Sequence, residues 1–284
     1  MEKKYTLRKS KTNRGLLRVV ANKDFTLLDG SKVIKGDLGG LITSEENLSQ
    51  EGNCWVCHDA KVIGEAKVLD DAVLFDNAIV NEHAVIKGKA MIKDKAIVTD
   101  DSTVVGSAVV SGSARIEDNT CVMGNATVTG KALVMNSASI SGHAVIKECA
   151  MISGGRVSDS VVCSGRTQIY SKAIIKGKTV MTGRAAVIGK SFIKTNHTIG
   201  LNLFNDIEYS YNFSGEKYVK ILDENYYEYS LIPVSSYGCL LVHPNNNVYV
   251  YLLRGFQNIP YGAAFENFED LWKTLQKCAK SPLL

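Results

Sequence analysis

A six-residue repeat in the middle of the sequence constrains the fold more than any other feature. Every sixth residue from Ala60 to Ala150 is alanine, apart from Ser102 and Thr120. The second residue after each of these positions is aliphatic in all sixteen hexads, and the residue two further on is always Gly, Asp, Glu or Asn. Chance does not produce a register of this length. The repeat unit is Ala-x-Val-x-Gly-x.

The frame shifts back by one residue after Ala150 and then continues to about residue 195. From there its aliphatic slot holds Val157, Cys163, Ile169, Ile175, Met181, Val187 and Ile193. One residue is therefore missing near 150–155, and we expect a tight or kinked turn there.

A period of six fits a short strand followed by a corner. In each strand the alanine and the aliphatic residue would point inward, and Gly, Asp or Asn at the corner tolerates unusual backbone angles. Three strands and three corners close a triangular coil of 18 residues, and successive coils stack by strand pairing at about 4.8 Å. The sequence therefore predicts a single-stranded parallel β-helix built from hexapeptide repeats.

The repeat resembles the left-handed β-helix proteins of the hexapeptide-repeat class. The motifs Gly36-Asp37-Leu38-Gly39-Gly40, Asn47-Leu48-Ser49 and Gly52-Asn53-Cys54-Trp55-Val56 are similar to those of a bacterial and prophage subgroup with an N-terminal β cap. Some members of that subgroup are labelled transferases. The left-handed sense is implied by this resemblance, because the common hexapeptide pattern places Gly directly after the aliphatic residue and this sequence does not.

The two ends of the chain lack the repeat. We expect residues 1–53 to form a β cap, with short strands and a turn within 16–35, and residues 54–197 to form the β-helix. Residues 198–284 hold ten of the twelve tyrosines and all four prolines. Their pattern predicts a small α+β domain, with strands at 218–222, 226–234, 239–243 and 248–253, a turn at 244–247 and a capped helix over 267–275.

Two outward columns of the predicted coils are mainly apolar. Residues 18 apart stack on one face. One such ladder is apolar except for Lys61 and Arg115, and a second is apolar except for Thr127. Soluble monomers seldom expose large apolar patches, so we expect one ladder to be covered by a homo-oligomer (a dimer or trimer) or by a terminal domain. The alternative is that β-branched residues merely favour strands. The candidate residues are Val73, Ile79, Met91, Ile97, Val109, Leu133, Val145 and Met151.

The segment 155–200 is basic, with eight Lys/Arg residues and only Asp159 as an acid. Its corner slots place cations in five successive hexads, which three-fold coiling distributes around the helix as a collar. They are candidates for binding an anion, nucleic acid or an acidic protein patch, although solvated corners would show the same pattern. These residues are Arg166, Lys172, Lys178, Arg184 and Lys190.

The sequence offers no catalytic or metal-binding constellation. Cys54 and Cys57 match a haem-attachment spacing, but an extended strand would point Cys54 inward and Cys57 outward, and no second CxxC pair completes a zinc site. His83 and His143 lie ten hexads apart and are expected to be solvated corner residues. We predict no cofactor and no metal.

The composition is that of a soluble globular protein, with 45% hydrophobic residues and a net charge of +4. No apolar run approaches the ~18 residues needed to cross a membrane, and no secretory signal stands at the beginning of the sequence. Together with seven cysteines, these features predict a cytoplasmic protein with reduced thiols and no membrane association.

Two functional hypotheses follow. The first is a non-catalytic β-helix scaffold that binds a protein partner, with Tyr227 and Tyr229 on one strand face as recognition candidates. Given the resemblance to prophage proteins, one version is a phage-encoded inhibitor of a host complex. The second is a hexapeptide-repeat acyltransferase acting on a small molecule at a subunit interface. The uninterrupted repeat disfavours the second, because those enzymes often carry a loop that breaks the coil.

Overall fold

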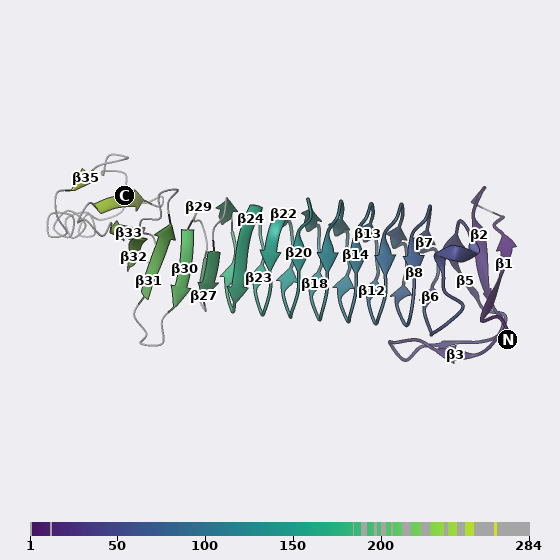
Figure 1. The fold of residues 1–284 in the computed structure, drawn as a ribbon. Helices are drawn as coiled ribbons and strands as arrows, with labels where there is room; N and C mark the ends of the chain where they lie inside the picture. The colour runs from purple at the N-terminus through teal and green to yellow at the C-terminus, as the bar shows by residue number, and fades with distance from the viewer. Residues whose placement is uncertain are drawn as a thin grey trace, which may run out of the picture.

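We describe the protein from a computed structural model. Its backbone is described for residues 2–11, 13–183, 185–188, 192–195, 198–199, 203–205, 207–211, 217–222, 228–235, 238–242, 248–252 and 264–265, and its side chains for 2–11, 13–183, 185–187 and 192–194. Figure 1 shows stacked coils forming a long prism, with β1 and β2 at one end and β31 to β33 at the other. This confirms the predicted parallel β-helix.

Antiparallel strands form the N-terminal end. Strand β1 (Tyr5–Lys9) pairs with β2 (Leu17–Ala21), and β2 pairs with β5 (Leu38–Ile42). Strands β3 (Phe25–Thr26) and β4 (Lys32–Val33) make a small hairpin, and a 3-10 helix, η1, spans Glu45–Asn47. Because β5 also pairs in parallel with the first coil, the cap is continuous with the prism.

Three parallel faces make up the prism, and each strand from β6 to β19 pairs with the strand 18 residues further on. Face 1 begins with β7 (Lys61–Val62), β10 (Ile79–Val80), β13 (Ile97–Val98), β16 (Arg115–Ile116) and β19 (Leu133–Met135). Face 2 begins with β8 (Lys67–Val68), β11 (Val85–Ile86), β14 (Thr103–Val104), β17 (Cys121–Val122) and β20 (Ser139–Ile140).

Face 3 is the separate nine-stranded sheet. It comprises β6 (Trp55–Val56), β9 (Val73–Leu74), β12 (Met91–Ile92), β15 (Val109–Val110), β18 (Thr127–Val128), β21 (Val145–Ile146), β23 (Val162–Cys163), β25 (Val180–Met181) and β28 (Thr198–Ile199). We call the edge between faces 1 and 2 corner 1, the edge between faces 2 and 3 corner 2, and the edge between faces 3 and 1 corner 3.

The later coils depart from this regularity. Strands β22 (Met151–Val157) and β24 (Gln168–Gly177) each run across corner 1 and belong to both faces. Face 1 continues with β26 (Ala186–Ile188) and β29 (Leu203–Asn205), and face 2 with β27 (Phe192–Thr195) and β30 (Ile207–Tyr211). Parallel pairing therefore extends beyond the predicted boundary at residue 197, because strands can stack after the hexad pattern has faded.

An antiparallel series extends face 2 at the C-terminal end. Strand β30 pairs with β31 (Lys217–Leu222), which is followed by β32 (Glu228–Ser235), β33 (Gly238–Val242), β34 (Val248–Leu252) and β35 (Ala264–Phe265). Strands β31 to β34 match the four predicted from sequence. The predicted helix over 267–275, the turn at 244–247 and Tyr227 lie outside the described residues. The backbone of Tyr229 lies in β32, and its side chain is not described.

The core of the prism is a dry column of small and aliphatic side chains. The inward alanines and aliphatic residues from Ala60 to Ile152 are at most 1% exposed. At the two exceptions to the alanine slot, the Ser102 hydroxyl donates to the Asp118 carbonyl oxygen at 2.7 Å, while the buried Thr120 hydroxyl has no hydrogen-bond partner. Ala beside Val or Ile fills the narrow prism as the repeat predicts.

The polar slot of the repeat has a hydrogen-bonding role at the corners. Many of its residues have positive φ, which Gly, Asn and Asp adopt more readily than other residues. Carboxylates in this slot also accept a hydrogen bond from the backbone N–H of the equivalent corner in the next coil. The pairs are Asp70 with Gly88, Asp76 with Asp94, Asp94 with Gly112, Asp100 with Asp118, Asp118 with Asn136, Glu148 with Gly165, and Asp159 with Gly177. The residues of this slot therefore adopt the backbone angle of the corner, and these acids also bind the N–H group of the next corner.

Candidate functional site

The coil irregularity predicted near 150–155 lies at corner 1. Leu133 pairs with Met151, a step of 18, whereas Ser139 pairs with Arg156, a step of 17. The missing residue therefore lies between Ser153 and Arg156. In the neighbouring coils this interval contains a buried alanine, Ala138 before it and Ala173 after it.

A pair of glycines makes the shortened corner possible. Gly154 and Gly155 have φ of 85° and 74°. A Cβ atom on Gly154 would lie 2.6 Å from the Ser171 carbonyl oxygen, and one on Gly155 would lie 2.5 Å from the Ala173 carbonyl oxygen. Both distances are far below van der Waals contact, so this corner requires glycine at both positions.

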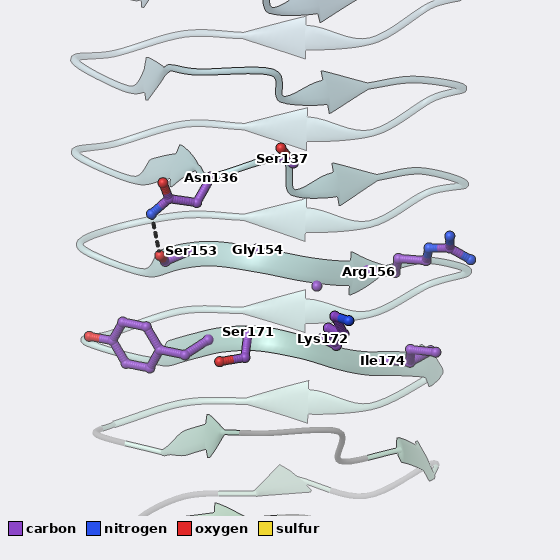
Figure 2. Close-up of a pocket in the computed structure, with 10 residues that line it drawn as sticks. Asn136, Ser137, Ser153, Gly154, Arg156, Ser171, Lys172 and Ile174 are labelled. Carbon is purple, nitrogen blue, oxygen red and sulfur yellow. Dashed lines mark hydrogen bonds between the residues drawn. The ribbon is translucent and has the colours of Figure 1, made fainter.

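An open groove of about 910 Å³ lies over the shortened corner (Figure 2). Most of its ten residues have polar side chains, two of them are basic, and none is acidic. We call this site the basic groove. Its residues are Asn136, Ser137, Ser153, Gly154, Gly155, Arg156, Tyr170, Ser171, Lys172 and Ile174.

Internal hydrogen bonds order one side of the basic groove. The Asn136 side-chain amide donates to the Ser153 hydroxyl at 2.8 Å, and the Tyr170 hydroxyl lies 3.6 Å from the Met151 sulfur. Arg156 and Lys172 are exposed on consecutive strands of the groove. Two cations beside several hydroxyl groups can bind a carboxylate or another oxyanion, because charge-assisted hydrogen bonds are the stronger ones.

An acidic edge precedes the basic groove along corner 1. Asp100 and Asp101 lie two coils before Asn136, and Glu117 and Asp118 lie one coil before it. Asp101 is exposed and its carboxylate lies 3.4 Å from His83 Nδ1, while Glu117 binds the Arg115 guanidinium. We call these four acids the acidic ridge. Corner 1 thus changes from acidic to basic at Asn136.

The five cations of the predicted collar are distributed as expected where the structure describes them. Lys172 lies at corner 1, Lys178 at corner 2 and Arg166 at corner 3. Arg184 and Lys190 lie outside the described residues. Of the predicted cations with described side chains, only Lys172 lines the basic groove; Arg156 was missed, because it stands outside the corner slot in the sequence.

The two apolar ladders form, and they differ. On face 1, Ile79, Ile97, Leu133 and Met151 are half-buried and stacked, but the exposed Arg115 interrupts them. On face 3, an uncharged half-buried column runs without interruption through Met91, Val109, Thr127, Val145, Val162 and Val180.

Val73 was wrongly included among the exposed candidates, because it is fully buried. Its strand neighbour Trp55 is 2% exposed and contacts Phe25 of the β3–β4 hairpin edge-on, with ring centroids 5.2 Å apart. The N-terminal cap therefore covers the beginning of face 3.

Cys54 and Cys57 belong to the packing of the cap. Cys57, expected to point outward, is only 8% exposed and lies in the hydrophobic core cluster, and burial raises the pKa of its thiol to about 12. Cys54 is fully buried, with its sulfur 3.3 Å from Lys4 Nζ. Lys4 also donates to the carbonyl oxygens of Glu51, Gly52 and Cys54 at 3.0–3.2 Å, and burial lowers the pKa of Lys4.

The described residues contain no group of three or more His, Cys, Asp or Glu side chains that could hold a metal ion. His83 and His143 lie at different corners, His83 between Glu65 and Asp101 at corner 1 and His143 at corner 2. Within the same part of the chain, no helix is both long and apolar enough to cross a membrane.

No protein-family model matches the chain, and no curated protein matches it significantly.

Proposed function

We propose that the protein is a non-catalytic β-helix scaffold that binds a protein partner through face 3. The proposal includes self-association of the scaffold. The observation that supports this is the uninterrupted column from Met91 to Val180, which is apolar except for Thr127 and carries no charge. An apolar surface of this length on a rigid, flat sheet is typical of a protein-binding surface. A phage-encoded inhibitor of a host complex is one version of this proposal, and it draws on the resemblance to prophage proteins.

The alternative function, acyl transfer at a subunit interface, is supported only by the resemblance to hexapeptide-repeat proteins. The strands from β7 to β25 follow one another without an inserted loop, and this segment is fully described. A scaffold needs only such a regular surface, so the geometry supports binding better than catalysis.

The test compares two variants that carry the same charge change on different faces. V109K/V145K places two lysines on face 3, and T103K/S139K places two on face 2, which has half-buried residues at the same positions. Lysine is compatible with outward strand positions, since Lys61 and Lys67 already occupy them. Both variants should therefore fold, which circular dichroism verifies.

Each immobilised full-length protein is exposed to a bacterial lysate, and retained proteins are quantified by mass spectrometry. We expect the wild type and the face 2 variant to retain the same partner in stoichiometric amount, and the face 3 variant to lose it. Retention of the same proteins by all three, or of none in stoichiometric amount, would overturn the proposal. A bound acyl-carrying small molecule in place of a protein would favour the acyltransferase.

A further inference from the structure

The charge reversal along corner 1 matches a second copy of the same chain. From Glu65 to Asp118 the charged corner slots are acidic, and beyond Asn136 the charged groups of the described edge are Arg156 and Lys172. Corner 3 mixes acids and bases within single coils, as in Lys93, Asp94 and Lys95 and in Lys147 and Glu148, and corner 2 shows no such separation. At corner 2 acids and bases alternate along the prism, with Asp70 and Asp71, then Lys87 and Lys89, then Asp159, then Lys176 and Lys178.

The spacing of the charges is symmetric about Asn136. Glu117 and Asp118 lie one coil before it and Arg156 one coil after it, while Asp100 and Asp101 lie two coils before it and Lys172 two coils after it. Coils are about 4.8 Å apart, so the acids and bases stand at about 5 and 10 Å on either side. A two-fold axis beside Asn136, perpendicular both to the prism and to the outward direction of corner 1, therefore brings the coils of the acidic ridge of one copy opposite the coils of the basic groove of the other.

We infer that two copies pack antiparallel along corner 1, with the acidic ridge of each seated in the basic groove of its partner. This two-fold contact is isologous, so both charge contacts form in one closed dimer. Lys172 binds the exposed carboxylate of Asp101, which stands at the same position of the corner, and the groove has room for it because the corner residue is missing. Arg156 adds positive charge to the groove, and Glu117, which binds Arg115 of its own copy, adds negative charge to the ridge.

Apolar side chains lie where the two-fold axis would pass. Leu133, Met135 and Met151 are half-buried on face 1 beside the basic groove. An interface with an apolar centre and charged ends is the common arrangement of protein contacts. Five coils span only about 19 Å along the edge, so the dimer should be dissociable and sensitive to salt.

This inference rests on the self-association included in the proposed function and names its surface. Three full-length variants test it. R156E/K172E makes the groove acidic, D101K/E117K makes the ridge basic, and R166E/K178E is a matched control on corners 3 and 2. Asp100 and Asp118 are left unchanged, because they bind backbone N–H groups of the next coil.

Sedimentation equilibrium at low salt measures the dissociation constant of each protein. We expect that of the groove variant and that of the ridge variant to rise at least about tenfold, because like charges then meet at both contacts, and that of the control to stay near the wild-type value. An equimolar mixture of the groove and ridge variants should form a heterodimer, since each acidic groove meets a basic ridge and each acidic ridge meets a basic groove.

A second measurement tests the position of the axis. S137C should form an intermolecular disulfide under mild oxidation, because a two-fold axis at this coil brings the two Ser137 positions together, whereas the exposed corner 3 variant S113C should not. A wild-type dimer that neither charge variant weakens would overturn the inference and leave self-association intact. A wild type that stays monomeric at tens of micromolar would overturn both, while binding of a partner to face 3 remains a separate measurement.

Discussion

The regular coils and the shortened corner are built from the same repeat but form surfaces of different shape. From Ala60 to Ile140 each hexad places an aliphatic side chain and an alanine, replaced only by Ser102 and Thr120, in the core, and each corner repeats the one before it. Between Ser153 and Arg156 one inward residue is missing, two strands run straight across the edge, and a groove lies over the corner. Regular stacking makes flat surfaces, and a single missing residue is enough to make a concave one.

The sharpest way to break the regular region is to place a charge in its core. V98D puts a carboxylate at a fully buried position surrounded by aliphatic side chains. Removing the compensation of a buried charge costs about 3–5 kcal/mol, so we expect a loss of at least that size in the free energy of unfolding. Urea denaturation followed by circular dichroism measures it.

The matched control for V98D is T99D at the adjacent half-exposed corner position. Its carboxylate can remain hydrated, so we expect a change within about 0.5 kcal/mol. Equal unfolding midpoints for the two variants would contradict the dry core.

Two glycine substitutions compare the corners directly. G64A and G155A both place alanine at positive φ, but the added Cβ lies 3.2 Å from the nearest backbone oxygen at Gly64 and 2.5 Å at Gly155. We expect a loss of about 1 kcal/mol for G64A from the backbone angle alone, and about 3 kcal/mol for G155A, which adds a clash with the next coil.

Chemical denaturation of both glycine variants measures the difference. If G155A were as stable as G64A, the shortened corner would be less tightly packed against Ala173 than the structure shows.

A smaller change in the free energy of unfolding should distinguish the shortened coil from the regular coils at alkaline pH. Cys163 occupies the aliphatic slot in the shortened coil, where the regular coils have Val, Ile or Leu, and burial raises the pKa of its thiol to about 12. The unfolded thiol has a pKa of about 8.5, so above that pH the unfolded state loses a proton that the folded state keeps. Stability is full below pH 8.5 and falls as the pH approaches 12.

C163V should remove this dependence. At pH 10 the wild type should have lost about 2 kcal/mol through Cys163, which C163V retains, while at pH 7 the two proteins should agree within about 1.5 kcal/mol because valine fits the slot. Cys57, with a raised pKa of its own, remains in both proteins and cancels in the comparison. Parallel pH profiles for the two proteins would show that Cys163 ionises without unfolding.

The sequence by itself determined the period, the inward residues and the place of the irregularity. Ala and the aliphatic residue pack inward, and the polar residue occupies the corner. Because each role recurs every six residues, the pattern can be identified from the sequence alone. The missing residue was visible for the same reason, as a break in the register after Ala150.

Only the tertiary structure decided what these features form together. The basic groove combines Asn136, Arg156 and Lys172 from three successive coils, and their proximity depends on strand pairing across 17 or 18 residues. Val73 and Cys57 fit an outward pattern but are buried, at the end of the prism where Phe25 of the N-terminal hairpin packs against Trp55, the strand neighbour of Val73. A local pattern fixes which way a side chain points along its strand, whereas the rest of the chain decides whether anything covers it.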